Sequence, residues 1–207
     1  MTGDGTPDVV TGAGPGGGPH VKVFDGTSGT LVEQWMAYDV AFRGGVSVAA
    51  GDVDGDNLAD IVTGAGPGGG PHVKVFAGAN GALLSQTFAY ESSFRGGVWV
   101  AAGDVDADGR AEVITAPGDS GGPYVKIFRG SELSLLRGFL AYDAAFRGGA
   151  RVAAVDATGD GKADIATAAG PGGGPHVKLF DGNTGAEVYG LMAFDPNFRG
   201  GIFVAAG

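Results

Sequence analysis

The sequence repeats itself with a period of 52 residues. The segment GDVDGDNLADIVTGAGPGGGPHVKVF begins at Gly51, and a close copy begins 52 residues later at Gly103. A third copy, VDATGDGKADIATAAGPGGGPHVKLF, begins at Val155, again without an insertion. The chain starts inside an earlier copy, in which Asp4 aligns with Asp56. Self-similarity at such a period predicts an array of structural units, each too small to bury its apolar residues alone.

Each repeat predicts four short strands and no helix. These strands read VWVAAGDV (VSVAAGDV one repeat earlier), DIVTGAG, HVKVF and LLSQTFAY, and glycine-rich turns separate them. Four antiparallel strands in a repeating unit are typical of a β-propeller blade. We therefore expect one all-β domain over residues 1–207, a four-bladed β-propeller of 52-residue, four-stranded blades. The expected blades are residues 202–207 with 1–39, residues 46–91, residues 98–143 and residues 150–195.

The two ends of the chain indicate how the ring closes. The segment IFVAAG at residues 202–207 corresponds to the inner strand that the first blade lacks. We expect it to pair beside Asp8 to Gly14, so that the N- and C-terminal strands close the ring and remove exposed sheet edges. Small residues on the inner strands, such as Ala49 and Ala50, fit a narrow hub. A monomer is the favoured state, and two chains forming an eight-bladed ring are the alternative.

The composition excludes several classes of protein. Glycine supplies 43 of the 207 residues, but without the one-in-three spacing of collagen. The chain has no cysteine, so it has no disulfide framework and no thiolate metal site. A formal charge of -10 argues against nucleic acid as a partner. No apolar run approaches the ~20 residues of a membrane helix, so we expect a soluble chain, without membrane insertion, whose export signal lies outside it.

The strongest chemical signal lies in the turn between the first and second strands of each repeat. In DVDGDNLAD, the carboxylates of Asp52, Asp54, Asp56 and Asp60 occupy positions 1, 3, 5 and 9, and the backbone carbonyl of Leu58 at position 7 can add an oxygen. This alternation turns several oxygens toward one hard cation, and calcium takes about six to eight oxygen ligands. The flanks are strands, so the loop is not an EF-hand. The sequence predicts a calcium site here.

The same loop recurs with altered ligands. The third repeat keeps four acids, the fourth replaces one carboxylate with a hydroxyl, and the split first loop keeps only two acids. Fewer charged ligands weaken calcium binding, so we expect the second and third loops to bind most tightly and the first least. The candidate ligands, with position 7 offering its carbonyl, are Asp104, Asp106, Asp108, Arg110 and Glu112, then Asp156, Thr158, Asp160, Lys162 and Asp164, then Thr2, Asp4, Thr6 and Asp8.

The segment DVDGDNLADIVTGAG and its copies resemble FG-GAP/VCBS repeats, the calcium-loop blades of integrin α-subunit propellers and of many bacterial secreted and surface proteins. The resemblance covers the whole chain. It implies several calcium ions, bound between strands one and two of the blades, and a secreted or cell-surface adhesion or ligand-binding module. Integrin-type rings have more than four blades, which is one departure. Asn57 in place of the usual glycine is another, and asparagine tolerates the left-handed conformation.

A second set of repeated residues belongs to the opposite face of the expected ring. It consists of His20, His72, Tyr124 and His176 after the loop joining strands two and three, and of Arg43, Arg95, Arg147 and Arg199 in the connections between blades. Such a face can bind an acidic sugar or a partner carboxylate, because arginine offers a planar fork of donors. The favoured interpretation is architectural, with arginine pairing to an acid such as Asp39 or Asp143 and histidine capping a hairpin.

Residues that bind a ligand should instead break the repeat. Those that do include Trp35, Trp99, Arg110, Tyr124, Arg129, Glu132, Arg137, Arg151 and Phe203. An enzyme should show one asymmetric acid and base pair, and the sequence offers none that the repeats do not match. We therefore expect an extracellular interaction module for a protein or glycan ligand, not an enzyme. The alternatives are a polysaccharide-acting enzyme domain and a purely structural repeat fragment of a larger surface protein.

Overall fold

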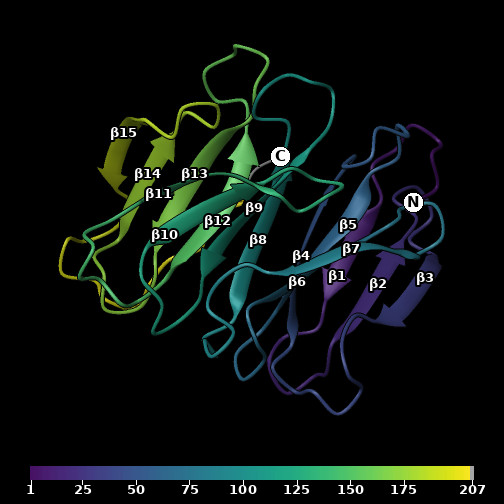
Figure 1. Ribbon diagram of the computed structural model, residues 1–207, viewed down its shortest axis with the longest axis horizontal. Helices are drawn as coiled ribbons and strands as arrows, with labels where there is room; N and C mark the ends of the chain where they lie inside the picture. The colour runs from purple at the N-terminus through teal and green to yellow at the C-terminus, as the bar shows by residue number, and fades with distance from the viewer. Residues whose placement is uncertain (206–207) are drawn as a thin grey trace.

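The computed structural model describes residues 1–205 and consists of β-strands and loops. Its 15 strands form four antiparallel sheets, and within each sheet neighbouring strands follow one another in the sequence. No helix long and apolar enough to span a membrane occurs in these residues. Figure 1 shows the four sheets arranged as successive blades, with the inner strands toward the middle of the molecule. The predicted all-β class is confirmed, and the second, third and fourth sheets have the four predicted strands.

The strands of each sheet fall in consecutive stretches of the chain. The first sheet contains β1 (Val9–Gly12), β2 (His20–Phe24) and β3 (Leu31–Met36). The second contains β4 (Val46–Gly51), β5 (Asp60–Ala65), β6 (His72–Phe76) and β7 (Leu83–Phe88). The third contains β8 (Val98–Gly103), β9 (Glu112–Pro117), β10 (Tyr124–Phe128) and β11 (Leu135–Leu140). The fourth contains β12 (Ala150–Val155), β13 (Asp164–Ala169), β14 (His176–Phe180) and β15 (Glu187–Met192).

The apolar core lies between neighbouring blades. One cluster joins Val62 and Val73 of the second blade to Val113 and Phe128 of the third. Every residue of β5 is buried, because the blades on either side cover both faces of this strand. The same holds for β9. Each blade therefore depends on its neighbours for burial, as expected for a repeat that cannot fold alone.

Glycine and alanine let the inner strands approach closely at the hub. A Cβ atom added at Gly51 of β4 would lie 2.8 Å from the Cβ of Ala111 and 3.0 Å from the Cβ of Ala102, both in the next blade. Gly103 is enclosed in the same way by Ala154 and Ala163 of the fourth blade. Larger side chains at these positions would push adjacent blades apart, so the small residues set the distance between blades.

The C-terminal segment reaches the hub without forming a strand. Residues 201–205 are in no strand, and β1 pairs with β2 alone, which leaves the first sheet with three strands. The backbone N–H of Ile202 donates to the carbonyl of Ala169 at 3.2 Å. Residues 203–205 line a central channel together with β4, β8 and β12. Residues 206 and 207 of the predicted closing strand lie outside the described residues, so its pairing with residues 8–14 stays a prediction.

The loops divide between two edges of the molecule. Figure 1 shows the turns that follow the inner strands β4, β8 and β12 along the upper edge, close to the side where the N-terminal segment lies. The glycine-rich loops that follow β1, β5, β9 and β13 lie along the lower edge, together with the connections between blades. The acidic loops are thus separated from the repeated histidine and arginine residues by the length of a strand.

Candidate metal centres

The acidic turn of the second blade is shaped by its first aspartate. The carboxylate of Asp52 accepts hydrogen bonds from the backbone N–H of Gly55 at 2.7 Å and of Asn57 at 2.9 Å. Asn57 has a φ of 69°, so it adopts the left-handed conformation expected at this place. In the third blade, Asp104 accepts in the same way from Ala107 at 2.7 Å and from Gly109 at 2.9 Å. The aspartate at position 1 therefore holds the loop in a tight turn around its own carboxylate.

Two of these turns bring three carboxylates together. In the second blade, one oxygen each of Asp52, Asp54 and Asp60 lie within 4.8 Å of one another. In the third blade, one oxygen each of Asp104, Asp106 and Asp108 also lie within 4.8 Å of one another. Calcium–oxygen bonds measure about 2.3–2.6 Å, so oxygens up to about 5 Å apart can share one ion. Each of these two clusters can hold a metal ion.

A buried oxygen atom indicates that the cluster of the third blade suits a cation. The Oδ1 atom of Asp106 is buried and has no hydrogen-bond partner among the described residues. A buried polar atom without a partner is costly, and an ionised one more so. A hard cation among these carboxylates would supply the missing interaction. The donor set and this orphaned oxygen both fit a calcium-like ion.

The expected ligands do not all join the clusters. The carboxylate of Asp56 accepts from the backbone N–H of Leu58 at 2.8 Å and stands outside the first cluster. Asp60 is fully buried and accepts from the backbone N–H groups of Val53 and Gly78, both at 3.0 Å. Asp60 therefore ties the turn to the blade and contributes one oxygen to the cluster.

Glu112 occupies the place of Asp60 in the third blade but is not part of its cluster. Its carboxylate is buried and accepts from the backbone N–H of Val105 at 3.0 Å. Burial raises the pKa of Glu112 to about 7, and the nearby carboxylates of Asp106 and Asp108 act in the same direction. Burial likewise raises the pKa of Asp60. The ninth position thus lies in a less polar environment than the rest of the turn.

The first and fourth turns form no such cluster within the described residues. In the fourth turn, one oxygen of Asp164 accepts from the backbone N–H groups of Ala157 at 3.1 Å and Thr158 at 2.9 Å. In the split first turn, the carboxylate of Asp8 accepts from the backbone N–H of Thr2, and this bond lowers its pKa. Backbone donors hold these carboxylates, as they hold Asp52 and Asp60 in the second turn, but here three acids do not come together among the described residues.

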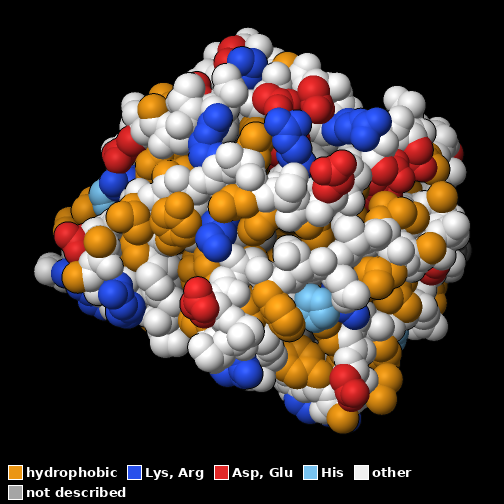
Figure 2. Space-filling model, in the orientation of Figure 1, with side chains coloured by type: hydrophobic (Ala, Val, Ile, Leu, Met, Phe, Trp, Pro, Cys, Tyr) orange, Lys and Arg blue, Asp and Glu red, His pale blue; other side chains and the backbone are white. Residues whose placement is uncertain are grey.

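The acidic turns of neighbouring blades touch each other. The side chain of Arg110 from the third blade packs against Gly55 of the second, where an added Cβ would lie 2.9 Å from its Nε atom. Gly55 also has a φ of 83°, which favours glycine. Figure 2 shows acidic side chains gathered along this edge, with lysine and arginine side chains among them. The edge therefore carries mixed charge, with its acids concentrated in the turns.

The repeated arginines hold their own connections between blades. The Nη1 atom of Arg43 donates to the backbone carbonyls of Val40 and Phe42. Arg95, Arg147 and Arg199 make the same pair of bonds in their repeats. The expected pairing with Asp39 or Asp143 is not made, because these acids accept from backbone N–H groups two residues later. The arginines act as caps of the connecting loops.

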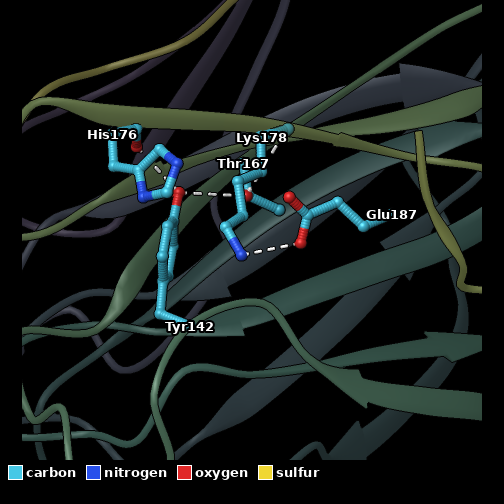
Figure 3. Close-up of polar contacts among 5 residues, drawn as sticks. All are labelled: Tyr142, Thr167, His176, Lys178 and Glu187. Atoms are coloured by element: carbon cyan, nitrogen blue, oxygen red, sulfur yellow. Dashed lines mark hydrogen bonds and ion pairs between the residues drawn. The ribbon is translucent and has the colours of Figure 1, made fainter. Parts of the chain in front are cut away.

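The repeated histidines lie on strands rather than at hairpin caps. The Nε2 atoms of His20 and His72 lie 3.0 Å from the side-chain oxygens of Gln34 and Gln86 on the adjacent strands. The ring centres of His176 and Tyr142 are 5.8 Å apart. Figure 3 shows these two side chains next to each other. Tyr124, their counterpart in the third blade, is 38% exposed. None of these side chains belongs to the acidic turns.

A hydrogen-bonded contact between blades was missed by sequence reasoning. The hydroxyl of Tyr38 donates to the carbonyl of His72 at 2.8 Å and lies 3.1 Å from the Oγ1 atom of Thr63. The ammonium of Lys74 donates back to the carbonyl of Ala37 at 2.9 Å. The recurrence of Tyr in the segments AYD and AYE, one period apart, is the signal that could have revealed this contact.

The contact recurs at the next two interfaces with small changes. Tyr90 and Lys126 repeat it between the second and third blades. At the third interface, Tyr142 reaches Thr167 and the carbonyl of His176, while Lys178 forms an ion pair of 2.7 Å with Glu187 (Figure 3). Burial raises the pKa of Tyr142 and of the other two tyrosines far above the usual value. These hydroxyls therefore remain protonated donors.

Comparisons with solved structures show the fold. The chain resembles the exotype rhamnogalacturonan lyase YesX with a TM-score of 0.53 at 14% identity, over 87% of this chain and 42% of that one. A Bacillus licheniformis rhamnogalacturonan lyase gives a TM-score of 0.53 at 13% identity, over 86% and 43%. BamB from Moraxella catarrhalis gives 0.50 at 15% identity, over 92% and 48%. The chain spans less than half the length of these proteins.

The family comparison identifies the repeat. Residues 1–63 match the FG-GAP-like repeat, and residues 44–83 match the FG-GAP repeat. No curated protein matches the chain. The same 52-residue unit continues from the matched segment to the C-terminus. Residues 1–83 therefore match FG-GAP repeats, and the chain has a β-propeller fold.

Proposed function

We propose that the chain is a calcium-binding β-propeller that acts as an extracellular interaction module. The observation that carries the proposal is the pair of three-carboxylate clusters in equivalent turns, one of which contains the unpartnered buried oxygen of Asp106. Two clusters in the corresponding turns of successive repeats, which share positions 1 and 3, support a metal-binding role over chance proximity of acids. The FG-GAP match agrees with this assignment.

Calcium suits these turns better than magnesium does. Magnesium requires near-ideal octahedral geometry and keeps several of its waters, whereas calcium accepts a flexible set of about six to eight oxygens. The turn of the second blade supplies carboxylates from Asp52, Asp54 and Asp60, and Leu58 offers a backbone carbonyl at position 7. Water can complete the coordination, because Asp52 and Asp54 are only partly buried.

The metal would stabilise the blade. Without a cation, the carboxylates of one turn repel each other, and that turn joins the first two strands of the sheet. A ligand that binds only the folded chain adds about 2.7 kcal/mol of stability when present at a hundred times its dissociation constant. Partly exposed turns with three carboxylates resemble extracellular calcium modules, whose dissociation constants reach about 0.1–1 mM. This supports a secreted or cell-surface location.

The outer strands support an interaction role. They expose large apolar side chains, including Leu83 and Phe88 of β7, Leu135 and Leu140 of β11, and Tyr189 and Met192 of β15. Where such residues join into one patch, they mark a surface that meets a protein or glycan partner. We expect a rigid ring that presents these surfaces and requires calcium for its rigidity.

We propose binding rather than catalysis. The likeness to rhamnogalacturonan lyases concerns the fold, since identity is 13 to 14%. Incubation with acidic polysaccharide and calcium should yield no unsaturated uronate, the product of β-elimination. Formation of that product would favour a polysaccharide-acting enzyme domain. Absence of any partner in a glycan array and a protein pull-down would favour a structural repeat.

A further inference from the structure

One position on the inner strands differs in every repeat. Ser47, Trp99, Arg151 and Phe203 lie 52 residues apart and occupy equivalent places. All four line a cavity of about 430 Å³ at the mouth of the central channel, beside the loops Gly14-Pro15 and Gly66-Pro67. The blade fold does not require these four different side chains, because the surrounding residues keep the repeat. Their variety therefore indicates a specific role for the cavity.

Arg151 lies against two aromatic rings of this cavity. The centre of its guanidinium is 5.5 Å from the ring centre of Trp99 and 4.8 Å from that of Phe203. The two rings are 5.5 Å apart and nearly perpendicular. These contacts fix the planar guanidinium by cation–π interactions and leave its N–H groups to bind an acceptor.

The guanidinium of Arg151 lacks a polar partner. Arg151 is 8% exposed, and its Nε atom is buried without a hydrogen-bond partner in the described part of the chain. Ser47, at the equivalent position, is satisfied by a bond of 2.8 Å to the carbonyl of Val98. Asp119 also lines the cavity and its charge acts on Arg151, although the two side chains form no ion pair in the described part of the chain. A buried donor without a partner is costly, and Arg151 lines the cavity, so an acceptor that enters it and reaches the guanidinium would lower this cost.

We propose that this cavity binds a small organic carboxylate with an apolar ring face, of the class of the hexuronate sugars. The carboxylate would accept hydrogen bonds from Arg151, and the ring would pack on Trp99 and Phe203. A volume of about 430 Å³ accommodates one or two sugar units. Asp119 and a net charge of -10 repel any anion, and they repel a doubly charged phosphate more strongly than a carboxylate with one negative charge.

This site rests on the proposed interaction function and adds the chemical class of the ligand to it. The test titrates glucuronate and glucose into the calcium-loaded full chain, followed by the indole signal of Trp99 in NMR spectra. Glucuronate should bind at least about tenfold more tightly than glucose, because a charged hydrogen bond is lost with glucose. Arg151→Gln should weaken glucuronate binding at least about tenfold. Arg129→Gln removes the same charge at an exposed place outside the cavity and should leave binding unchanged.

Several outcomes would overturn the site. Equal affinity for glucose and glucuronate, tighter binding of inorganic phosphate, or unchanged binding by Arg151→Gln would each do so. If Arg151→Gln fails to fold, Arg151→Lys keeps the charge without the fork and should still weaken binding. Titration of free glucuronate and of an oligosaccharide that ends in glucuronate shows whether the ligand is a free metabolite or the end of a polysaccharide. Calcium uptake measured in the same samples reports on the proposed function independently, so a failure of the cavity is distinguishable from a failure of the metal sites.

Discussion

The hydroxyl of Tyr38 donates a hydrogen bond of 2.8 Å to the backbone carbonyl of His72, which belongs to the next blade. The contact places a polar bond at the edge of the apolar interface between the blades. Thr63, which also meets this hydroxyl, is fully buried. Burial protects the bond from water, so each such tyrosine fixes the position of one blade on the next.

Removal of this hydroxyl should destabilise the ring. Tyr38→Phe leaves the carbonyl of His72 and the hydroxyl of Thr63 without that partner, so we expect the free energy of unfolding to fall by about 1–2 kcal/mol. Denaturant unfolding measures the change. Tyr189→Phe is the matched control, because Tyr189 is 52% exposed on β15. An equal effect of the two substitutions would contradict the role of the contact between blades.

The last six residues should be needed for a stable ring. Ile202 is buried, and its backbone N–H donates to the carbonyl of Ala169. Between the fourth and first blades, Phe194 and Thr11 stand at the places of Tyr38 and Thr63, and both are exposed. Deletion of residues 202–207 should lower the melting temperature or cause oligomers. A truncated chain that stays a monomer with an unchanged melting temperature would contradict closure.

Sedimentation of the intact chain measures the number of chains in the ring. A mass near 20.4 kDa is expected for the four-bladed ring, and twice that mass for the eight-bladed alternative.

Two partly buried histidines should destabilise the fold on mild acidification. Burial lowers the pKa of His72 and of His176, and the neighbouring lysines Lys74 and Lys178 act in the same direction. In the unfolded chain both histidines take up protons near pH about 6.5, before they do so in the folded chain. The contribution of these histidines to the free energy of unfolding should therefore fall as the pH drops from about 7 to about 5. The raised pKa of Glu112 acts in the opposite direction, so the histidines are tested by comparison with the double variant His72→Gln and His176→Gln at saturating calcium. The unchanged chain should lose stability relative to this variant as the pH falls, and identical slopes of the two would refute this origin.

Substitution of a single ligand should abolish calcium binding at one cluster. Asp106→Ala removes a carboxylate whose Oδ1 atom is buried without a partner, so it should abolish calcium uptake by the third blade while leaving the metal-free chain folded. Ser120→Ala alters an exposed residue outside both clusters and should change nothing. Calorimetric stoichiometry reports the difference. Full calcium uptake by Asp106→Ala would remove this residue from the site.

The sequence was sufficient to predict the blade but not every contact around it. Period and alternation predicted the strands, because both reflect local geometry, as in HVKVF of β6. The acidic spacing predicted which turns gather carboxylates, yet not that Asp56 would bond to its own turn at Leu58. That choice depends on side-chain rotation, which spacing does not determine. The site of Arg151 required the ring, because residues 52 positions apart meet only at the hub.

Calcium titration by calorimetry tests the central claim most directly. The intact chain, first freed of metal by a chelator, should take up calcium at the turns of Asp52 and Asp104 before any other site, and its melting temperature should rise with calcium concentration. Magnesium at the same concentration should have a smaller effect. Absence of heat on calcium addition, together with melting curves that coincide with and without chelator, would contradict the metal-binding role of these turns.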